Sequence, residues 1–142
     1  MIRLLDLLAR VILAALFLYA GIMKLRDPAG FAEELENYRL ISGRVATSAG
    51  YLVPWLEILA AAALLTKPLR LGGWLASVAL SAGFTAFVVS AWMRGLDISC
   101  GCFGSSDSTV GLTAAARAAG IFIVAAAGLR GEIGRQANRS QS

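Results

Sequence analysis

Residues 71–93 read LGGWLASVALSAGFTAFVVSAWM and contain no charged side chain. They make up most of an apolar segment, 69–93, in which Arg70 carries the one charge. A helix needs about 20 predominantly apolar residues to cross the hydrocarbon core of a bilayer. The segment is long enough to do so and predicts a membrane-spanning helix, although a buried helix of a soluble protein can have the same composition.

The rest of the chain decides between a membrane protein and a soluble one. Three more apolar segments of spanning length cover residues 4–23, 45–66 and 110–129. Hydrophobic residues make up 58% of the 142 residues and charged residues 15%, against about 45–50% and about 25% in soluble domains. Too little polar sequence remains to cover four such helices. The sequence therefore predicts an all-α fold, a four-transmembrane-helix bundle forming one domain over residues 1–130.

Polar residues mark the two ends of the chain. Asp6 and Arg10 interrupt the start of the first apolar segment. Because this segment is also long for a signal peptide, we expect a retained span rather than a cleaved leader. Residues 131–142 read GEIGRQANRSQS and are predicted to form a disordered cytoplasmic tail.

Four spans place both termini on the same side of the membrane. Basic residues divide almost evenly between the two sides, but the basic tail and the tight turn KPLR at 67–70 favour both termini in the cytoplasm. The longer loops, 24–44 and 94–109, are then expected outside the cytoplasm.

The first of these loops contains a helix signal. Asp27 followed by Pro28 is typical of a helix start, because aspartate caps the first turn and proline fits its first position. Apolar side chains then recur at helical spacing, at Phe31, Leu35 and Tyr38. The pattern predicts a short extracytoplasmic amphipathic helix over 28–38, which either lies on the bilayer or caps the bundle.

The chain contains no histidine. This absence excludes Ser-His-Asp and Cys-His catalysis, histidine-ligated haem and every zinc site that needs histidine. The net charge of +4 is better explained by membrane topology than by nucleic-acid binding. We therefore expect contact with membrane lipid and no nucleic-acid partner.

The two cysteines of the chain, Cys100 and Cys102, flank Gly101 and precede Phe103 in the sequence CGCFG. Cα atoms two residues apart lie roughly 5.5–7 Å from each other, and a disulfide needs about 4.4–6.8 Å. A bridge is therefore feasible where Gly101 allows a tight bend. Such a bridge would be strained and readily reduced, which suits a redox switch better than a structural staple.

Two other uses of the cysteines remain open. Two thiolates can bind a soft metal such as Cu(I), and buried cysteines often serve only in packing. Because no histidine can complete a tetrahedral site, we assign no metal site and favour the redox pair.

Two charged residues, Glu57 and Arg117, lie inside predicted spans. Both helices start from the outer side, and the depths of the two residues differ by only about 5 Å at 1.5 Å per residue. Charged groups inside a membrane usually face the bundle interior or a polar cavity. The simplest expectation is an ion pair between them. The functional alternative is a polar pocket for a proton relay or a quinone head group.

Three further residues are weaker candidates. Lys24 stands at the outer end of the first span, where a snorkelling anchor is the usual role, although a lysine near Cys100 would favour the thiolate. Asp97 would have the opposite effect, or would cap the loop. Tyr19 lies near Lys24 in the sequence and has no specific role assigned.

Three stretches together resemble a known family: YAGIMKLRDPAGFAEELENYRL (19–40), VPWLEILAAAALL (53–65) and RGLDISCGCFG (94–104), followed by Arg117 in the last span. In order and spacing they are similar to the DoxX-like superfamily and, within it, to the MauE branch named for methylamine utilisation. The resemblance covers nearly the whole predicted helical region.

The resemblance implies a small four-helix protein of the bacterial inner membrane. Such proteins are linked to thiol–disulfide exchange outside the cytoplasm, often beside thioredoxin-like proteins, and relatives in the superfamily are linked to quinone reduction. By the same resemblance Cys100 and Cys102 would be the redox pair. Lys24, Glu57 and Arg117 would be family-motif residues without a defined role.

The working hypothesis is a membrane-embedded thiol–disulfide oxidoreductase with an extracytoplasmic thioredoxin-like partner and quinone as a possible second redox partner. One alternative is a non-enzymatic assembly or maturation factor that binds a partner through its outer loops, around Phe31, Leu35 and Tyr38. Another is a Cu(I) carrier that uses the two thiolates.

Overall fold

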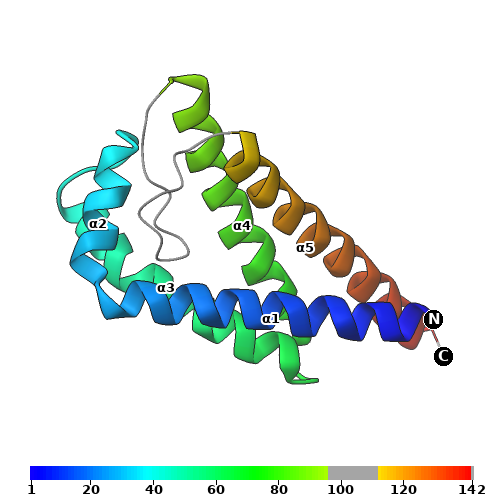
Figure 1. The fold of residues 1–142 in the computed structure, drawn as a ribbon. Coiled ribbons are helices and arrows are strands. Elements are labelled where there is room, and N and C mark those ends of the chain that lie inside the picture. Colours follow the sequence, from blue (N-terminus) through cyan, green and yellow to red (C-terminus); the bar gives the residue numbers. More distant parts are fainter. Residues whose placement is uncertain (96–111, 142) are drawn as a thin grey trace.

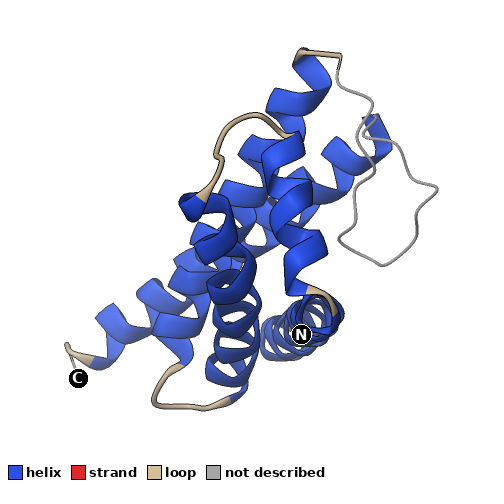
Figure 2. Ribbon diagram, turned by 90° about the vertical axis from the view of Figure 1, so that its left-hand side faces the viewer, coloured by secondary structure: helices blue, strands red, loops and turns tan. Residues whose placement is uncertain are grey.

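The computed structural model describes residues 1–95 and 112–141. Within them the chain forms helices and no strand (Figures 1 and 2). The helices are α1 (Ile2–Arg26), α2 (Pro28–Asn37), α3 (Arg44–Leu65), α4 (Arg70–Met93) and α5 (Leu112–Arg139). All but α2 are long and apolar enough to cross a membrane. The prediction of an all-α bundle with four transmembrane helices and one short helix between the first two is confirmed.

The long helices pack as two antiparallel pairs. Helix α1 packs chiefly on α3, α5 packs chiefly on α4, and contacts between α3 and α4 join the two pairs. Figure 1 shows that α1 and α5 approach each other where the chain termini lie and diverge away from that end. We call this end the terminal end, and the opposite end, which carries α2, the cap end.

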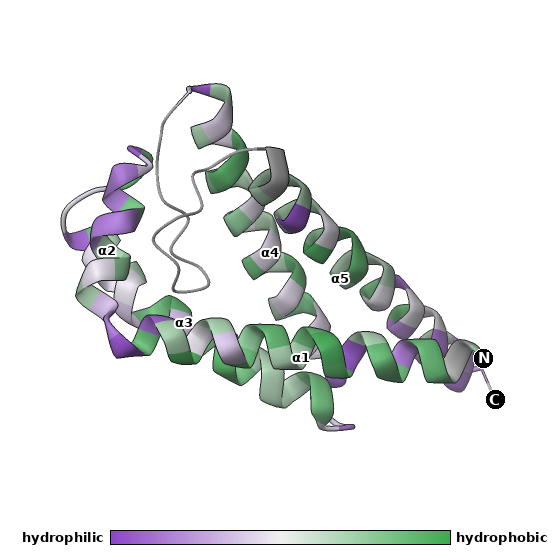
Figure 3. Cartoon of the chain, in the orientation of Figure 1, coloured by the Kyte–Doolittle hydropathy of each residue, from purple (hydrophilic) through white to green (hydrophobic). Residues whose placement is uncertain are grey.

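The outward faces of the long helices are apolar (Figure 3). On α3, for example, the exposed fractions of Leu52, Trp55 and Leu59 are 61%, 57% and 62%. Side chains of this kind would be unfavourable in water over such a large surface, whereas lipid tails solvate them well. The surface pattern therefore agrees with a multi-pass membrane protein.

The core is assembled from small residues around one large ring. Trp74 of α4 is fully buried and packs in a cluster with Leu13, Phe17 and Leu64. A Cβ atom at Gly128 of α5 would lie 2.1 Å from the Trp74 ring, so only glycine lets α5 approach this closely. Small residues that allow close helix contact are typical of membrane bundles.

Helix α2 caps the bundle. Its first turn is fixed as the sequence predicted, because the Asp27 carboxylate accepts a hydrogen bond from the Gly30 backbone amide at 2.9 Å. Ala32, Leu35 and Tyr38 are buried, and α2 packs on α3. Of the two expected positions, on the bilayer or over the bundle, the structure shows the second.

Tyr38 links this cap to α4 and α5. Its ring meets Phe87 edge-on, with ring centroids 5.6 Å apart. It shares a buried cluster with Val88 and Ala115, and the Arg94 guanidinium donates a hydrogen bond to its backbone carbonyl. The end of α4 and the start of α5 therefore belong to the cap end.

The structure corrects the prediction of a disordered C-terminal tail. Helix α5 does not end near residue 129 but continues to Arg139, so residues 131–139 are helical. Arg135 on this extension pairs with Asp6 of α1 at 2.7 Å and with Glu132 one turn before it at 3.0 Å. These ion pairs give a polar extension the tertiary contacts that its composition did not reveal.

Candidate functional site

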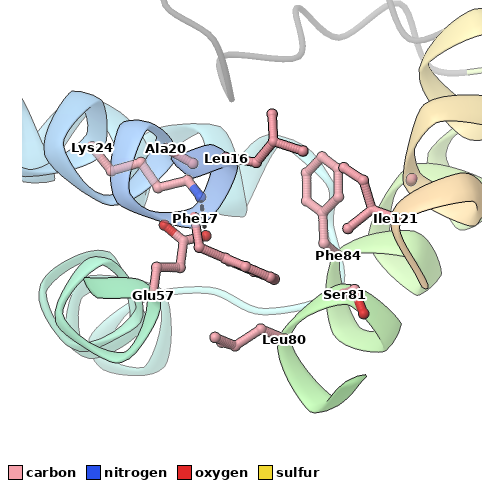
Figure 4. Close-up of a pocket in the computed structure, with 10 residues that line it drawn as sticks. Leu16, Phe17, Ala20, Lys24, Glu57, Leu80, Ser81, Phe84 and Ile121 are labelled. Carbon is pink, nitrogen blue, oxygen red and sulfur yellow. Dashed lines mark hydrogen bonds and ion pairs between the residues drawn. The ribbon is translucent and has the colours of Figure 1, made fainter. Parts of the chain in front are cut away.

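A buried ion pair lies between α1 and α3. The Lys24 ammonium donates a hydrogen bond to Glu57 Oε1, and each residue is only 6% exposed. Figure 4 shows the two side chains meeting between their helices, while Leu80 and Phe84 reach into the same space from α4. Because two opposite charges are buried here between membrane-spanning helices, this pair is the best candidate for a functional site in the described part of the chain.

The local sequence explains why these two charges meet. Gly21 stands one turn before Lys24 on α1, and Pro54 stands one turn before Glu57 on α3. A Cβ atom at Gly21 would lie 2.9 Å from the Pro54 carbonyl oxygen. It would also lie 3.4 Å from Glu57 Cβ, so the missing side chain lets α1 touch α3 directly beside Glu57, and the long Lys24 side chain, one turn further along α1, reaches the Glu57 carboxylate.

The ion pair leaves one polar atom without a partner. Glu57 Oε2 is buried and has no hydrogen-bond partner among the described residues. The Lys24 ammonium lies 5.0 Å from the centroid of the Phe31 ring, a distance at which a cation–π attraction contributes. The ammonium is therefore well compensated, while the carboxylate keeps an unused acceptor in an apolar setting, which is costly unless something donates to it.

Two cavities adjoin the pair. The smaller, of about 50 Å³, lies between α1, α3, α4 and α5. The larger, of about 320 Å³, lies between α2, α3 and α4, with Lys24 of α1 on its wall. Both are lined by Lys24, Glu57, Leu80 and Phe84. The larger one reaches the lower end of the range for small-molecule sites, about 300–1,000 Å³. The ion pair is thus the polar element shared by two mainly apolar cavities.

The predicted pairing of Glu57 with Arg117 is wrong. Glu57 pairs with Lys24, and Arg117 is exposed on α5, where it forms no ion pair with any residue the structure describes. Arg117 lines an apolar groove of about 660 Å³ between α1 and α5. The cause is helix adjacency: α3 packs on α1, α2 and α4, whereas α5 packs on α4, and equal depth in the membrane does not make two helices neighbours.

The structure also shows where the two weaker candidates on α1, Lys24 and Tyr19, lie. Lys24 was expected to be a snorkelling anchor, but its ammonium is turned inward and buried. Tyr19 lies on an outward face with an exposed fraction of 48%. Sequence reasoning named Lys24 but missed its role, although Gly21, one turn before Lys24, was a signal for a close helix contact at this point.

The remaining candidates, Asp97, Cys100, Gly101, Cys102 and Phe103, lie outside the described residues. The residues that flank their segment are described. Gly95 follows the end of α4, and Leu112 begins α5, so both flanks belong to the cap end. Within residues 1–95 and 112–141 no group of three or more acidic, cysteine or histidine side chains is arranged to hold a metal ion.

Comparisons with a family model and with a curated protein both match the chain to the same family. A family model, methylamine utilisation protein MauE, matches residues 2–131. A curated relative from Paracoccus denitrificans, methylamine utilization protein MauE, is 32% identical over 95 residues, which cover 66% of this chain and 51% of the relative. The chain thus spans about half the length of that relative. No solved structure matches it.

Proposed function

Since the chain belongs to the MauE family of methylamine utilisation proteins, we propose that it is a membrane-embedded thiol–disulfide oxidoreductase whose reactive groups are Cys100 and Cys102. Its partner is an extracytoplasmic thioredoxin-like protein. Family membership supports a role in methylamine utilisation. The cysteine pair, which provides the only thiols in the chain, supports the redox chemistry.

One structural observation carries the proposal. The segment that contains both cysteines starts after Gly95 and ends before Leu112, and both of these flanks stand at the cap end, where the buried Lys24–Glu57 pair also lies. A thiol pair carried between these two flanks could meet a water-soluble partner at that end of the bundle.

The exchange itself needs no group beyond the thiols of the two proteins. One cysteine thiolate attacks the partner's disulfide, forms a mixed disulfide and releases the partner's other sulfur as a thiolate. The second cysteine thiolate then attacks the mixed disulfide, closes the Cys100–Cys102 bond and releases the partner as a dithiol. Two electrons pass to the partner, and the same steps reversed reduce the Cys100–Cys102 bond.

A quinone is the proposed redox partner on the membrane side. Its ring would suit the larger cavity, which is mainly apolar and has volume for a ring. The Lys24 ammonium would donate a hydrogen bond to a quinone oxygen, and the Glu57 carboxylate would accept one from a hydroxyl group of the reduced form. A bound quinone would take up the two electrons and two protons that a dithiol loses on forming a disulfide. The protein's part is to supply a dry ring site with one ammonium donor and one carboxylate acceptor.

We further propose that the protein lies in the bacterial inner membrane with both termini in the cytoplasm and the cap end outside. The basic turn KPLR at 67–70 and the basic residues near the C-terminus support this orientation. Helix α2 then faces the compartment in which thioredoxin-like partners of secreted disulfide proteins work.

The assembly-factor alternative loses part of its support. It requires a docking surface around Phe31, Leu35 and Tyr38, but Leu35 and Tyr38 are 9% and 5% exposed and are packed within the protein. Substitutions there would disturb the fold of the cap rather than a docking surface. The oxidoreductase proposal remains the one that uses the cysteine pair.

The deciding test is thiol labelling in intact cells with a membrane-impermeant maleimide, before and after mild reduction. We expect labelling only after reduction, which corresponds to an oxidised pair outside the cytoplasm. The variant Cys100→Ser/Cys102→Ser removes every thiol in the chain and is the background control. Labelling that appears only after the cells are opened contradicts the proposed orientation, and stoichiometric copper in the purified reduced protein supports the metal-carrier alternative instead.

A further inference from the structure

The starting observation is an unused hydrogen-bond acceptor at a cavity. Glu57 is 6% exposed, lines both cavities, and has one oxygen, Oε2, without a partner among the described residues. Its other oxygen already receives the Lys24 ammonium. A ligand that completes this site must therefore bring a hydrogen-bond donor and not merely an acceptor.

Charge balance restricts the ligand further. The Lys24 ammonium and the Glu57 carboxylate compensate each other, and no other charged side chain except Glu34 lines the larger cavity among the described residues. Burying a charged ligand beside a compensated pair in an apolar cavity would be expensive. The donor is therefore expected to be neutral, such as a hydroxyl group.

The walls favour a planar ring as the body of the ligand. The larger cavity is lined by the rings of Phe31, Tyr38, Phe84 and Phe87, together with aliphatic side chains. Tyr38 and Phe87 already form an edge-to-face contact on one wall, and aromatic pairs in this geometry or in offset stacks stabilise each other beyond their buried area. A volume of about 320 Å³ accepts one ring but not a folded peptide.

We propose that the cavity beside Lys24 and Glu57 is a binding site for a neutral, membrane-soluble phenol or hydroquinone, whose hydroxyl group donates a hydrogen bond to Glu57 Oε2. The site distinguishes the hydroxyl form of a ring from its carbonyl form, because a carbonyl oxygen has no proton to donate. Such a ligand would be the reduced form of the membrane-side redox partner in the proposed function, so the inference deepens that function, but binding itself requires neither cysteine.

The test uses the purified full-length chain carrying Cys100→Ser and Cys102→Ser, in detergent and without oxygen. Isothermal titration compares a decyl-substituted hydroquinone with its dimethyl ether, which keeps the ring and the tail but has no hydroxyl group. We expect the hydroquinone to bind about tenfold more tightly or better, the effect of satisfying one buried acceptor. The corresponding quinone, whose carbonyl oxygens cannot donate to Glu57, should bind less tightly than the hydroquinone.

Matched glycine variants locate the site. Gly83 lines the larger cavity, Gly72 lies at the other end of α4, and a Cβ atom at either position meets nothing within 4 Å. We expect Gly83→Leu to abolish hydroquinone binding by filling the cavity and Gly72→Leu to leave it unchanged, with equal helix content by circular dichroism. Glu57→Gln should erase the preference for the hydroquinone over the quinone, because an amide can both donate and accept.

Equal affinity for the hydroquinone and its dimethyl ether would overturn the proposal, since water would then be satisfying Glu57. Binding that survives Gly83→Leu would also overturn it. Because the tested chain has no thiols, neither result bears on the exchange chemistry of Cys100 and Cys102. Conversely, labelling that appears only after the cells are opened would contradict the proposed orientation but would not affect the proposed ligand site.

Discussion

Arg135, near the end of α5, donates a hydrogen bond to Asp6, in the second turn of α1, at 2.7 Å. The pair joins the first and last membrane helices at the terminal end, where Asp6 also meets Arg10 at 2.9 Å. Away from this end α1 and α5 diverge (Figure 1). These polar contacts at the terminal end therefore add to the apolar packing between α1 and α5, where Leu13 and Ala125 share one buried cluster.

The Asp6–Arg135 contact should couple the two helices modestly. The Arg135 side chain is 38% exposed, so solvent screens the pair, and we expect a coupling free energy of about 0.5–1 kcal/mol. A double-mutant cycle with Asp6→Asn and Arg135→Gln, followed by thermal unfolding in detergent, measures it. Strictly additive effects of the two substitutions would show that the contact contributes nothing.

The Lys24–Glu57 pair should show the asymmetry expected of a buried ion pair. Lys24→Met leaves the Glu57 carboxylate buried without a counter-charge, and we expect it to lower the free energy of unfolding by about 3–5 kcal/mol. The double variant Lys24→Met/Glu57→Met removes both charges and should recover most of that loss. Unfolding with a denaturing detergent checks both variants, and a double variant as unstable as the single one would contradict the role of the uncompensated charge.

Arg117 provides the contrasting case. Because it is exposed and forms no ion pair with a described residue, we expect Arg117→Gln to change the free energy of unfolding by less than about 0.5 kcal/mol. The same unfolding assay used for Lys24→Met allows a direct comparison. A loss of unfolding free energy as large as that of Lys24→Met would indicate that Arg117 pairs with an acidic residue, as the sequence first suggested.

The contact at Gly21 should be sensitive to a single methyl group. In Gly21→Ala the new Cβ atom would lie 2.9 Å from both the Pro54 carbonyl oxygen and Ile58 Cγ1. Relieving this overlap must push α1 and α3 apart, at a cost of about 1–3 kcal/mol. Gly120→Ala is the matched control, since a Cβ atom there meets nothing within 4 Å and alanine favours a helix. Equal melting temperatures for the two variants would refute the close approach.

Single-cysteine variants should trap the partner. If Cys100 and Cys102 exchange disulfides as proposed, the variant that keeps only the attacking thiol stops at the mixed disulfide. We expect a covalent adduct with a thioredoxin-like protein in cells carrying one of Cys100→Ser or Cys102→Ser. Non-reducing electrophoresis followed by mass spectrometry identifies it. Adducts from neither variant, under conditions in which the wild-type pair is oxidised, would argue against the exchange.

The membrane spans and the cap helix could be predicted from the sequence because each depends on local properties. A charge-free run such as 71–93 needs only its own composition to be recognised, and Asp27 with Pro28 marks the start of α2 within two residues. Glu57 was singled out for the same reason, as a charge within an apolar segment, and the structure shows it buried.

The partner of Glu57 could not be predicted in this way. Depth along a helix follows from residue number, so Arg117 and Glu57 were matched by depth. Which helices are neighbours depends instead on where small residues allow contact, and here Gly21 brings α1 against α3. The helical character of residues 131–139 was missed for a related reason, since Arg135 finds its partner Asp6 at the opposite end of the chain.

The burial of Lys24 also has a consequence for how the chain is made. Its counter-charge lies on α3, so the ribosome synthesises α1 and α2 before Glu57 exists. An unpaired lysine ammonium is costly inside a bilayer and remains at the interface when it can. The last turn of α1 therefore reaches its final position only after α3 has been inserted. The order of assembly thus follows the order of translation, and formation of the Lys24–Glu57 contact completes the packing of α1 on α3.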